Sequence, residues 1–246
     1  MKRQKSIMGM PVAIEVLDKE VTDEDANEVF AYFHYIDETF STYKKGSEIS
    51  QINRGEIREK DFSNQAKKIF KLSEETKKLT NGYFDINING QLDPSGIVKG
   101  YAISQGAKIL QKKGLKNFFV EIAGDIQVSG KNKEGEKWSV GIQNPFNIKE
   151  IIKVVYLSDK GIATSGNYLR GEHIHNPIFK KNANEVALVT VIADDIFDAD
   201  RFATAAFAMG EKGIHFLESL KNIEGYMVTK SKKAIYTSDF EKYTIN

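Results

Sequence analysis

The sequence of 246 residues is 41% hydrophobic, enough to form a substantial core in one large domain or two closely packed ones. Its 35 basic and 34 acidic residues give a formal charge of +1, so the overall charge does not favour nucleic acid or an anionic membrane as a partner. There is no cysteine, which excludes disulfides, thiolate nucleophiles and cysteine metal sites.

The N-terminal segment lacks the pattern of a signal peptide. Residues 1–5 are basic, but residues 6–15 are too short and too interrupted to form an apolar signal core. No later run is long and apolar enough for a transmembrane segment. We therefore expect a cytoplasmic protein as the sequence stands, and an extracytoplasmic lipoprotein only if a leader has been removed.

The first third of the chain predicts a strand followed by two helices. Residues 7–16 have the apolar, β-branched character of a strand. The next helix opens at Thr22, which forms a capping-box pattern with Asp25 and precedes an apolar stripe. The remaining expectations here are a polar loop with one helical turn over residues 44–53 and a second helix over residues 64–80.

The middle of the chain holds the stretch around which the rest is organised, Asp93-Pro94-Ser95-Gly96-Ile97-Val98-Lys99-Gly100-Tyr101-Ala102. Pro94 and the two glycines allow a tight turn that leads into a helix, which is a place where backbone amides can hold phosphate. The helix is expected to stop at Gly114. The stretch matches neither a Walker loop nor a dinucleotide fingerprint, and similar turns occur in many proteins without a ligand.

The second half of the chain predicts strands that follow one another with only loops between them. Residues 161–168 are small and are expected to form a loop. The other elements are strands near 118–122, 126–128, 138–143, 151–157, 186–193, 226–229 and 233–237, and helices over 200–209 and 214–220. Such an order favours an α+β fold with mixed or largely antiparallel sheets and flanking helices. Residues 1–246 are expected to form a single domain or two fused lobes.

Asp200 and Thr204 are four residues apart on a predicted helix, so a carboxylate and a hydroxyl would lie on the same face. Two hard oxygen donors of this kind suit Mg²⁺. The alternative is that Asp200 caps the free amides at the start of the helix.

His173 and His175 form a His-x-His pair. Such a pair can bind zinc, but no third ligand has an obvious spacing. One neutral histidine could instead accept a proton from an attacking hydroxyl. Both could also be ordinary loop residues.

Taken together and in order, eight motifs give the chain its resemblance to the ApbE family, the FAD:protein FMN transferases. They are Met8-Gly9-Met10, the segment from Phe40 to Asn53, Gly82-Tyr83-Phe84-Asp85, the central stretch, Ala123-Gly124-Asp125, residues 163–168, His173-Ile174-His175-Asn176-Pro177 and Asp200-Arg201-Phe202-Ala203-Thr204. The resemblance covers nearly the whole chain and implies an ApbE-like fold.

The resemblance also implies an activity, the Mg²⁺-dependent transfer of FMN from FAD to a Ser or Thr hydroxyl of an acceptor protein, with release of AMP. By the same resemblance, Asp200, Thr204 and a backbone carbonyl at Gly96 would bind the metal, and His173 would be the catalytic base. The residues that would contact FAD are Met8, Phe84, Asp85, Asp93, Lys99 and Ile174. The acceptor would carry a pattern like Asp-x-x-Ser/Thr-x-Ala-Thr.

Three departures and two rival functions accompany the resemblance. Asn176 replaces the family's usual aspartate, His175 occupies the position before it, and Ala123 stands where a second glycine is common.

One rival function is that of a Mg²⁺-dependent FAD pyrophosphatase that gives FMN and AMP, with water as the acceptor. The other is a non-catalytic FAD-binding protein, favoured by Asn176 alone. Self-modification is not expected, because Arg201 stands where the internal segment 198–204 would need a hydroxyl.

Overall fold

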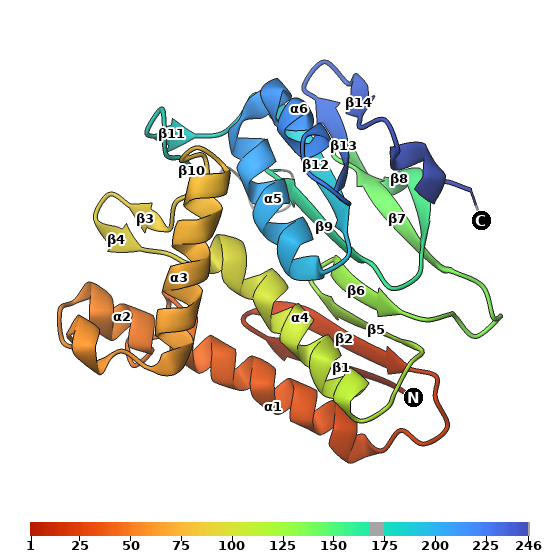
Figure 1. Cartoon of the computed structure of the whole chain (residues 1–246), viewed down its shortest axis with the longest axis horizontal. Helices are drawn as coiled ribbons and strands as arrows, with labels where there is room; N and C mark the ends of the chain where they lie inside the picture. The colour runs from red at the N-terminus through yellow and green to blue at the C-terminus, as the bar shows by residue number, and fades with distance from the viewer. Residues whose placement is uncertain (168–174, 246) are drawn as a thin grey trace.

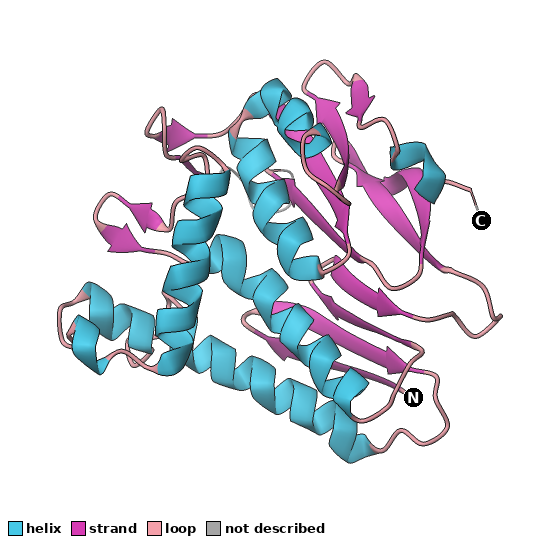
Figure 2. Ribbon diagram, viewed as in Figure 1, coloured by secondary structure: helices cyan, strands magenta, loops and turns pink. Residues whose placement is uncertain are grey.

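The computed structural model describes residues 1–167 and 175–245, apart from the side chain of Lys181. Its centre is an eight-stranded sheet in which every paired neighbour is antiparallel (Figures 1 and 2). This confirms the predicted α+β class with a largely antiparallel sheet. In spatial order the strands are β1 (Lys2–Ile7), β2 (Met10–Val16), β5 (Phe118–Ile122), β6 (Asp125–Ser129), β9 (Gly161–Gly166), β12 (Val186–Ala193), β13 (Glu224–Thr229) and β14 (Ala234–Tyr236).

Helices cover one face of this sheet (Figure 1). The main ones are α1 (Asp23–Phe40), α3 (Asn64–Leu79), α4 (Ser95–Lys112) and α5 (Ile196–Ala208), with the shorter α2 (Glu48–Asn53) and α6 (Gly213–Glu218). The predicted capping box at Thr22 is present, and α1 buries its apolar stripe in the core. Three short 3-10 turns complete the helical elements of the described residues, at Glu59–Asp61, Gly210–Lys212 and Phe240–Tyr243.

A long hairpin covers the opposite face of the sheet. Its strands are β7 (Trp138–Asn144) and β8 (Asn147–Leu157), which pair only with each other. A second apolar cluster lies beneath it and includes Trp138, Leu157 and Leu188. Two further strand pairs are small, β3 (Asn87–Ile88) with β4 (Gln91–Leu92) and β10 (His175–Asn176) with β11 (Lys181–Asn182).

The sheet consists of two halves that meet at a short seam. The strands β1, β2, β5 and β6 come from the first part of the chain, and β9, β12, β13 and β14 come from the last part. Across the seam, β6 and β9 pair through only two residue pairs, Ile126 with Ile162 and Gln127 with Gly161. Next to these pairs, the amide of Thr164 donates to Oδ1 of Asp125 at 3.1 Å. A side chain therefore extends the contact where the backbone ladder ends.

Three sequence-based expectations differ from the structure, two of them only in their bounds. The strand expected over residues 7–16 is the second arm of a hairpin, which turns at Met8 and Gly9 with φ of 58° and 66°. Positive φ at both central residues is typical of a tight hairpin turn. The loop expected over residues 161–168 begins with a central strand, β9. The helix expected from residue 200 already starts at Ile196.

No helix in residues 1–167 and 175–245 combines the length and apolar character needed to cross a membrane.

Candidate functional site

The central stretch places the start of α4 against α5. Asp93 shapes the turn before the helix, because its Oδ1 accepts a hydrogen bond from the Ser95 amide at 3.0 Å. In the first turn of this helix, the backbone of Gly96 lies directly on Thr204: a methyl group at Gly96 would stand 3.2 Å from Thr204 Cγ2 and 3.8 Å from its Oγ1. The predicted loop and helix residues are therefore brought together.

The two helices also meet closely at Gly100 and Asp200. The amide of Gly100 donates to Asp200 Oδ2 at 2.7 Å, and a methyl group at Gly100 would stand only 2.5 Å from Asp200 Cβ. Glycine is needed at this position because the two helices leave no space for a side chain. The alternative interpretation of Asp200 as the helix cap was wrong, since Asp195 is the N-cap of α5.

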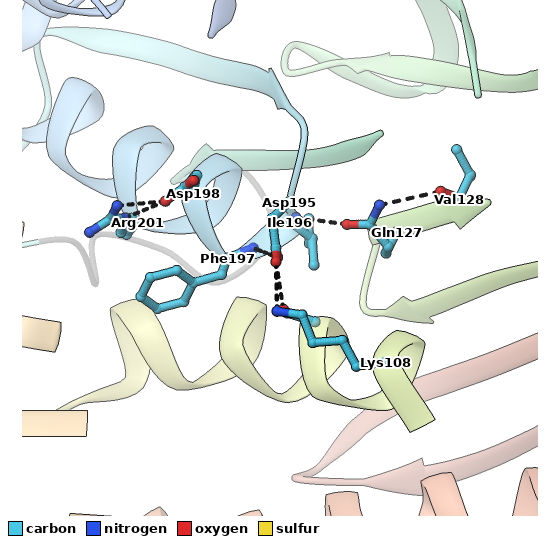
Figure 3. Close-up of polar contacts among 9 residues, drawn as sticks. Lys108, Gln127, Val128, Asp195, Ile196, Phe197, Asp198 and Arg201 are labelled. Carbon is cyan, nitrogen blue, oxygen red and sulfur yellow. Dashed lines mark hydrogen bonds and ion pairs between the residues drawn. The ribbon is translucent and has the colours of Figure 1, made fainter. Parts of the chain in front are cut away.

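Figure 3 shows how the start of α5 is fixed. Asp195 caps the helix through the Phe197 amide, at 3.0 Å, and its Oδ2 accepts hydrogen bonds from Lys108 and Ser104 of α4 at 2.9 Å. From β6, Oε1 of Gln127 accepts the Ile196 amide at 2.8 Å. These bonds tie α5 to both α4 and the sheet. They set the position of Asp200 one turn later.

A second buried carboxylate, Asp125, lies at the start of β6. Its Oδ2 is 2.5 Å from Nζ of Lys99, and the same ammonium is 3.8 Å from Oδ1 of Asp200. The side chain of Asp125 is 2% exposed and that of Asp200 is 5% exposed. Burial, reinforced by the nearby charge of Asp125, raises the pKa of Asp200 to about 7, although Lys99 opposes the rise.

The oxygen donors around Asp200 fit a magnesium ion. Asp200 and Thr204 lie one turn apart on α5, the backbone of Gly96 lies against Thr204, and Ser165 Oγ is 3.5 Å from Thr204 Oγ1. Carboxylate, hydroxyl and carbonyl oxygens are the ligands that Mg²⁺ prefers, and it keeps several positions for water or phosphate. Within the described residues no three His, Asp or Glu side chains cluster as a metal site, so this part of the chain offers no cage made of side chains alone.

Two of the residues expected at FAD lie beneath or beside the central stretch. Phe84 is a core residue, 3% exposed, and its ring lies under Gly96. Asp85 forms an ion pair with Lys77 at 2.6 Å and accepts a hydrogen bond from the Asn87 amide at 2.9 Å.

Met8 lies in the β1–β2 turn at the same end of the sheet as Asp125, because Pro11 O accepts the Ala123 amide at 3.0 Å. The other expected residues, His173 and Ile174, lie outside the described residues.

Two cavities flank the small β3–β4 hairpin. One has a volume of about 390 Å³ and is bordered by Thr42, Asn53 and Asp93 among others. The other, of about 230 Å³, is bordered by Phe62, Lys77 and Asp85 among others. Each cavity thus contains one of the acidic residues expected at FAD.

Asn176 has a structural explanation. Its side chain is buried, the Nδ2 group donates to Ala208 O at 2.6 Å, and Oδ1 accepts the amides of Ile178 and Phe179 at 3.0 Å. An ionised aspartate could accept these amides but could not donate to the helix carbonyl. The departure from the family pattern therefore anchors the β10–β11 turn to the end of α5.

Sequence reasoning missed the roles of Asp125 and Gly100. Both belong to motifs that the sequence analysis noted, but neither was given a function. A carboxylate directly after a strand and a tight turn is a signal for a site residue, and so is a glycine on the same helix face as Gly96, four residues later.

The model of the ApbE family matches residues 8–90 and 87–227. The chain belongs to the ApbE family. Among its relatives is the FAD:protein FMN transferase of Haemophilus influenzae, 30% identical over 167 residues that make up 62% of this chain and 48% of that protein. The Vibrio cholerae enzyme of the same name is 31% identical over 150 residues, 57% of this chain and 45% of that protein. The chain thus matches about half the length of these curated ApbE relatives.

Solved ApbE structures share the fold of the chain. The flavin transferase ApbE from Vibrio cholerae superposes with a TM-score of 0.87 at 23% identity, covering 99% of this chain and 98% of that one. The ApbE protein from Thermotoga maritima gives a TM-score of 0.89 at 21% identity, with 100% and 99% covered. The ApbE-like fold implied by the sequence motifs is therefore confirmed.

Proposed function

We propose that this ApbE family member transfers FMN from FAD to a Ser or Thr hydroxyl of an acceptor protein, with Mg²⁺ as cofactor and AMP as the second product. The supporting observation is the convergence of Gly96, Asp200 and Thr204 at the contact between α4 and α5. The names of the curated relatives support the same activity.

In the proposed reaction, the acceptor oxygen attacks the phosphorus of the FMN half of FAD. The bond from that phosphorus to the AMP oxygen breaks, AMP leaves with the bonding electrons, and the acceptor becomes a phosphodiester of FMN. The proton of the hydroxyl passes to a base, for which we propose His173. Bound Mg²⁺ would offset the negative charge of the diphosphate and of the leaving AMP.

The chain contains candidate residues both for binding the metal and for binding FAD. Asp200, Thr204 and the carbonyl of Gly96 would hold the metal. Met8, Phe84, Asp85, Asp93, Lys99 and Ile174 would contact FAD. The two cavities beside β3–β4, one bordered by Asp93 and the other by Asp85, support a ligand site around this hairpin. The acceptor is proposed to present a pattern like Asp-x-x-Ser/Thr-x-Ala-Thr.

The test is to incubate the chain with FAD, Mg²⁺ and a protein or peptide that carries this pattern, and to follow AMP release and acceptor mass. We expect one AMP for each FMN gained by the acceptor. EDTA and Asp200→Ala should abolish both signals. Asp194→Ala is the control, because Asp194 is an acid just before the start of α5 whose side chain is 58% exposed.

Two other results would replace the proposal. AMP with free FMN and an unmodified acceptor would identify a pyrophosphatase. Binding of FAD without AMP release would identify a carrier. The structural role of Asn176 removes the sequence feature that favoured the carrier.

A further inference from the structure

Three charged side chains form a buried group beside the proposed magnesium ligands. They are Asp125 on β6, Lys99 on α4 and Asp200 on α5, with side-chain exposures of 2%, 18% and 5%. Among the described residues this group holds two carboxyl groups and one ammonium, an excess of one negative charge when both acids are ionised. A buried carboxylate is costly unless it has a partner, so the position of the single ammonium between the two acids matters.

The Lys99 ammonium lies closer to Asp125 than to Asp200. It lies 2.5 Å from Asp125 Oδ2 and 3.8 Å from Asp200 Oδ1. Asp200 Oδ2 accepts the Gly100 amide at 2.7 Å, and Oδ1 is the oxygen nearest to the Lys99 ammonium. If Lys99 paired directly with Oδ1, its positive charge would oppose a divalent ion at the same carboxylate.

Asp125 is held firmly enough to keep the ammonium in place. It follows the tight turn at Ala123 and Gly124, where φ is 51° and 91°, and its Oδ1 accepts the Thr164 amide at 3.1 Å across the seam of the sheet. Its Oδ2 is buried and accepts no hydrogen bond of ordinary geometry from the described residues. That oxygen therefore depends on Lys99 for its compensation.

We propose that Asp125 is a positioning residue that takes Lys99 as its ion-pair partner and so keeps Asp200 available to a divalent cation. This inference rests on the proposed metal site and adds a residue to it. Among the described residues, Asp200 is the other acid next to the Lys99 ammonium, at 3.8 Å. It would become the ion-pair partner of Lys99 if the carboxylate of Asp125 were removed. The lysine would then neutralise the metal ligand and compete with the ion.

The test is a set of Mn²⁺ titrations, followed by the electron paramagnetic resonance signal of the free ion. Each chain that retains Lys99 is measured with Mn²⁺ alone and again with ADP, so that an ion held jointly with a diphosphate is also detected. We expect Asp125→Asn, which keeps an oxygen for the Thr164 amide, to weaken Mn²⁺ binding by about tenfold or more.

Removing the lysine separates this role from a purely structural one. The double variant Asp125→Asn with Lys99→Met retains Asp200 without a competing ammonium, and its Mn²⁺ affinity should return to within about threefold of the parent chain. In the titration with Mn²⁺ alone, Lys99→Met should bind the ion at least as tightly as the parent chain; the ADP arm is not used for this variant, because Lys99 is itself a proposed FAD contact. This single variant also keeps the test decisive if Asp125→Asn does not fold.

Several outcomes would overturn the inference. They are unchanged binding in Asp125→Asn, equally weak binding of Mn²⁺ alone in the double variant, weaker binding of Mn²⁺ alone in Lys99→Met, and no Mn²⁺ binding by the parent chain under either condition. None of these titrations uses FAD or an acceptor. AMP release by the parent chain, measured separately, therefore shows whether the proposed function fails as well.

Discussion

The helix face and the hairpin face of the central sheet bury polar groups in different ways. On the hairpin face the hydroxyls of the half-buried Thr164 and the buried Thr190 pair with each other at 2.8 Å, and Trp138 Nε1 donates to Ser129 O at 3.0 Å. On the helix face the carboxylates of Asp125 and Asp200 share one ammonium. The polar groups described on the hairpin face therefore satisfy one another by hydrogen bonds, whereas the charged group on the helix face has an excess of negative charge.

This difference implies that the hairpin face contributes to stability and the helix face to function. Neutral groups that satisfy one another rigidify a core, whereas a buried charge without full compensation lowers stability and persists where a ligand can compensate it. Substitutions on the helix face should therefore change cation binding, and those on the hairpin face should change only the free energy of unfolding.

The largest effect is expected from Asp200→Asn. AMP release from FAD should fall by about 10³-fold, because Asp200 is the one carboxylate among the proposed metal ligands. The ion-free variant should nevertheless melt no lower than the parent chain at pH 8, since the buried charge has been removed. Activity assays and melting curves in EDTA test the two parts. A clearly lower melting temperature would contradict the assigned cost of the buried carboxylate.

On the hairpin face, Leu188→Ala should reduce the free energy of unfolding by about 2–5 kcal/mol, because it creates a cavity at a side chain that is fully buried. Denaturant titration measures this loss. The Mn²⁺ affinity of the folded variant should match that of the parent chain. A large change in affinity would show that the two faces are not independent.

Gly100→Ala should affect both properties at once, because Gly100 lies where α4 meets the metal ligand. The added methyl group would stand 2.5 Å from Asp200 Cβ and 2.9 Å from Ile196 O, so the helices must move apart. We expect a loss of about 1–3 kcal/mol in unfolding free energy, together with weaker Mn²⁺ binding. Gly46→Ala is the control, since a methyl group there meets no atom within 4 Å. Equal behaviour of the two variants would argue against a tight helix contact.

The smallest effect concerns pH. Burial raises the pKa of Asp200 to about 7 from 3.8, so the ion-free fold gains from protonation of this group, and that gain is lost as the pH rises through about 7. Protons and metal compete for the same carboxylate. Mn²⁺ affinity should therefore be roughly tenfold lower at pH 6 than at pH 8. An affinity that does not change between these values would show that Asp200 stays ionised.

The sequence predicted the helices that carry the central stretch and the capping box, because their apolar periodicity and caps are local signals. It failed for β9, whose small residues follow no alternation, since both faces of the strand are covered. Gly161 must be small because a methyl group there would stand 2.3 Å from Ile196 N. It also failed for β1, where Lys2, Arg3 and Lys5 give an edge strand a polar sequence.

The candidate site likewise combines residues that the sequence predicted with residues that it did not. Gly96, Asp200 and Thr204 were found because motifs and helical spacing indicate them, and the structure brings them together. The pairing of Asp125 with Lys99 depends on packing between β6 and α4, which no short-range pattern encodes. The start of α5 was missed because Asp198 and Asp200 resemble caps, while the true cap, Asp195, is chosen by its bonds to α4.

The short seam between β6 and β9 has a consequence for motion within the sheet. Two residue pairs join its halves there, with the Val128 amide donating to Lys160 O at 2.9 Å beyond one end and the Thr164 amide donating to Asp125 Oδ1 beyond the other. Opening of the seam would expose that amide to solvent exchange and would also release the carboxylate that holds Lys99. The exchange rate of one backbone hydrogen thus reports on the integrity of the charged group. A bound divalent ion that favours the closed arrangement would slow that exchange.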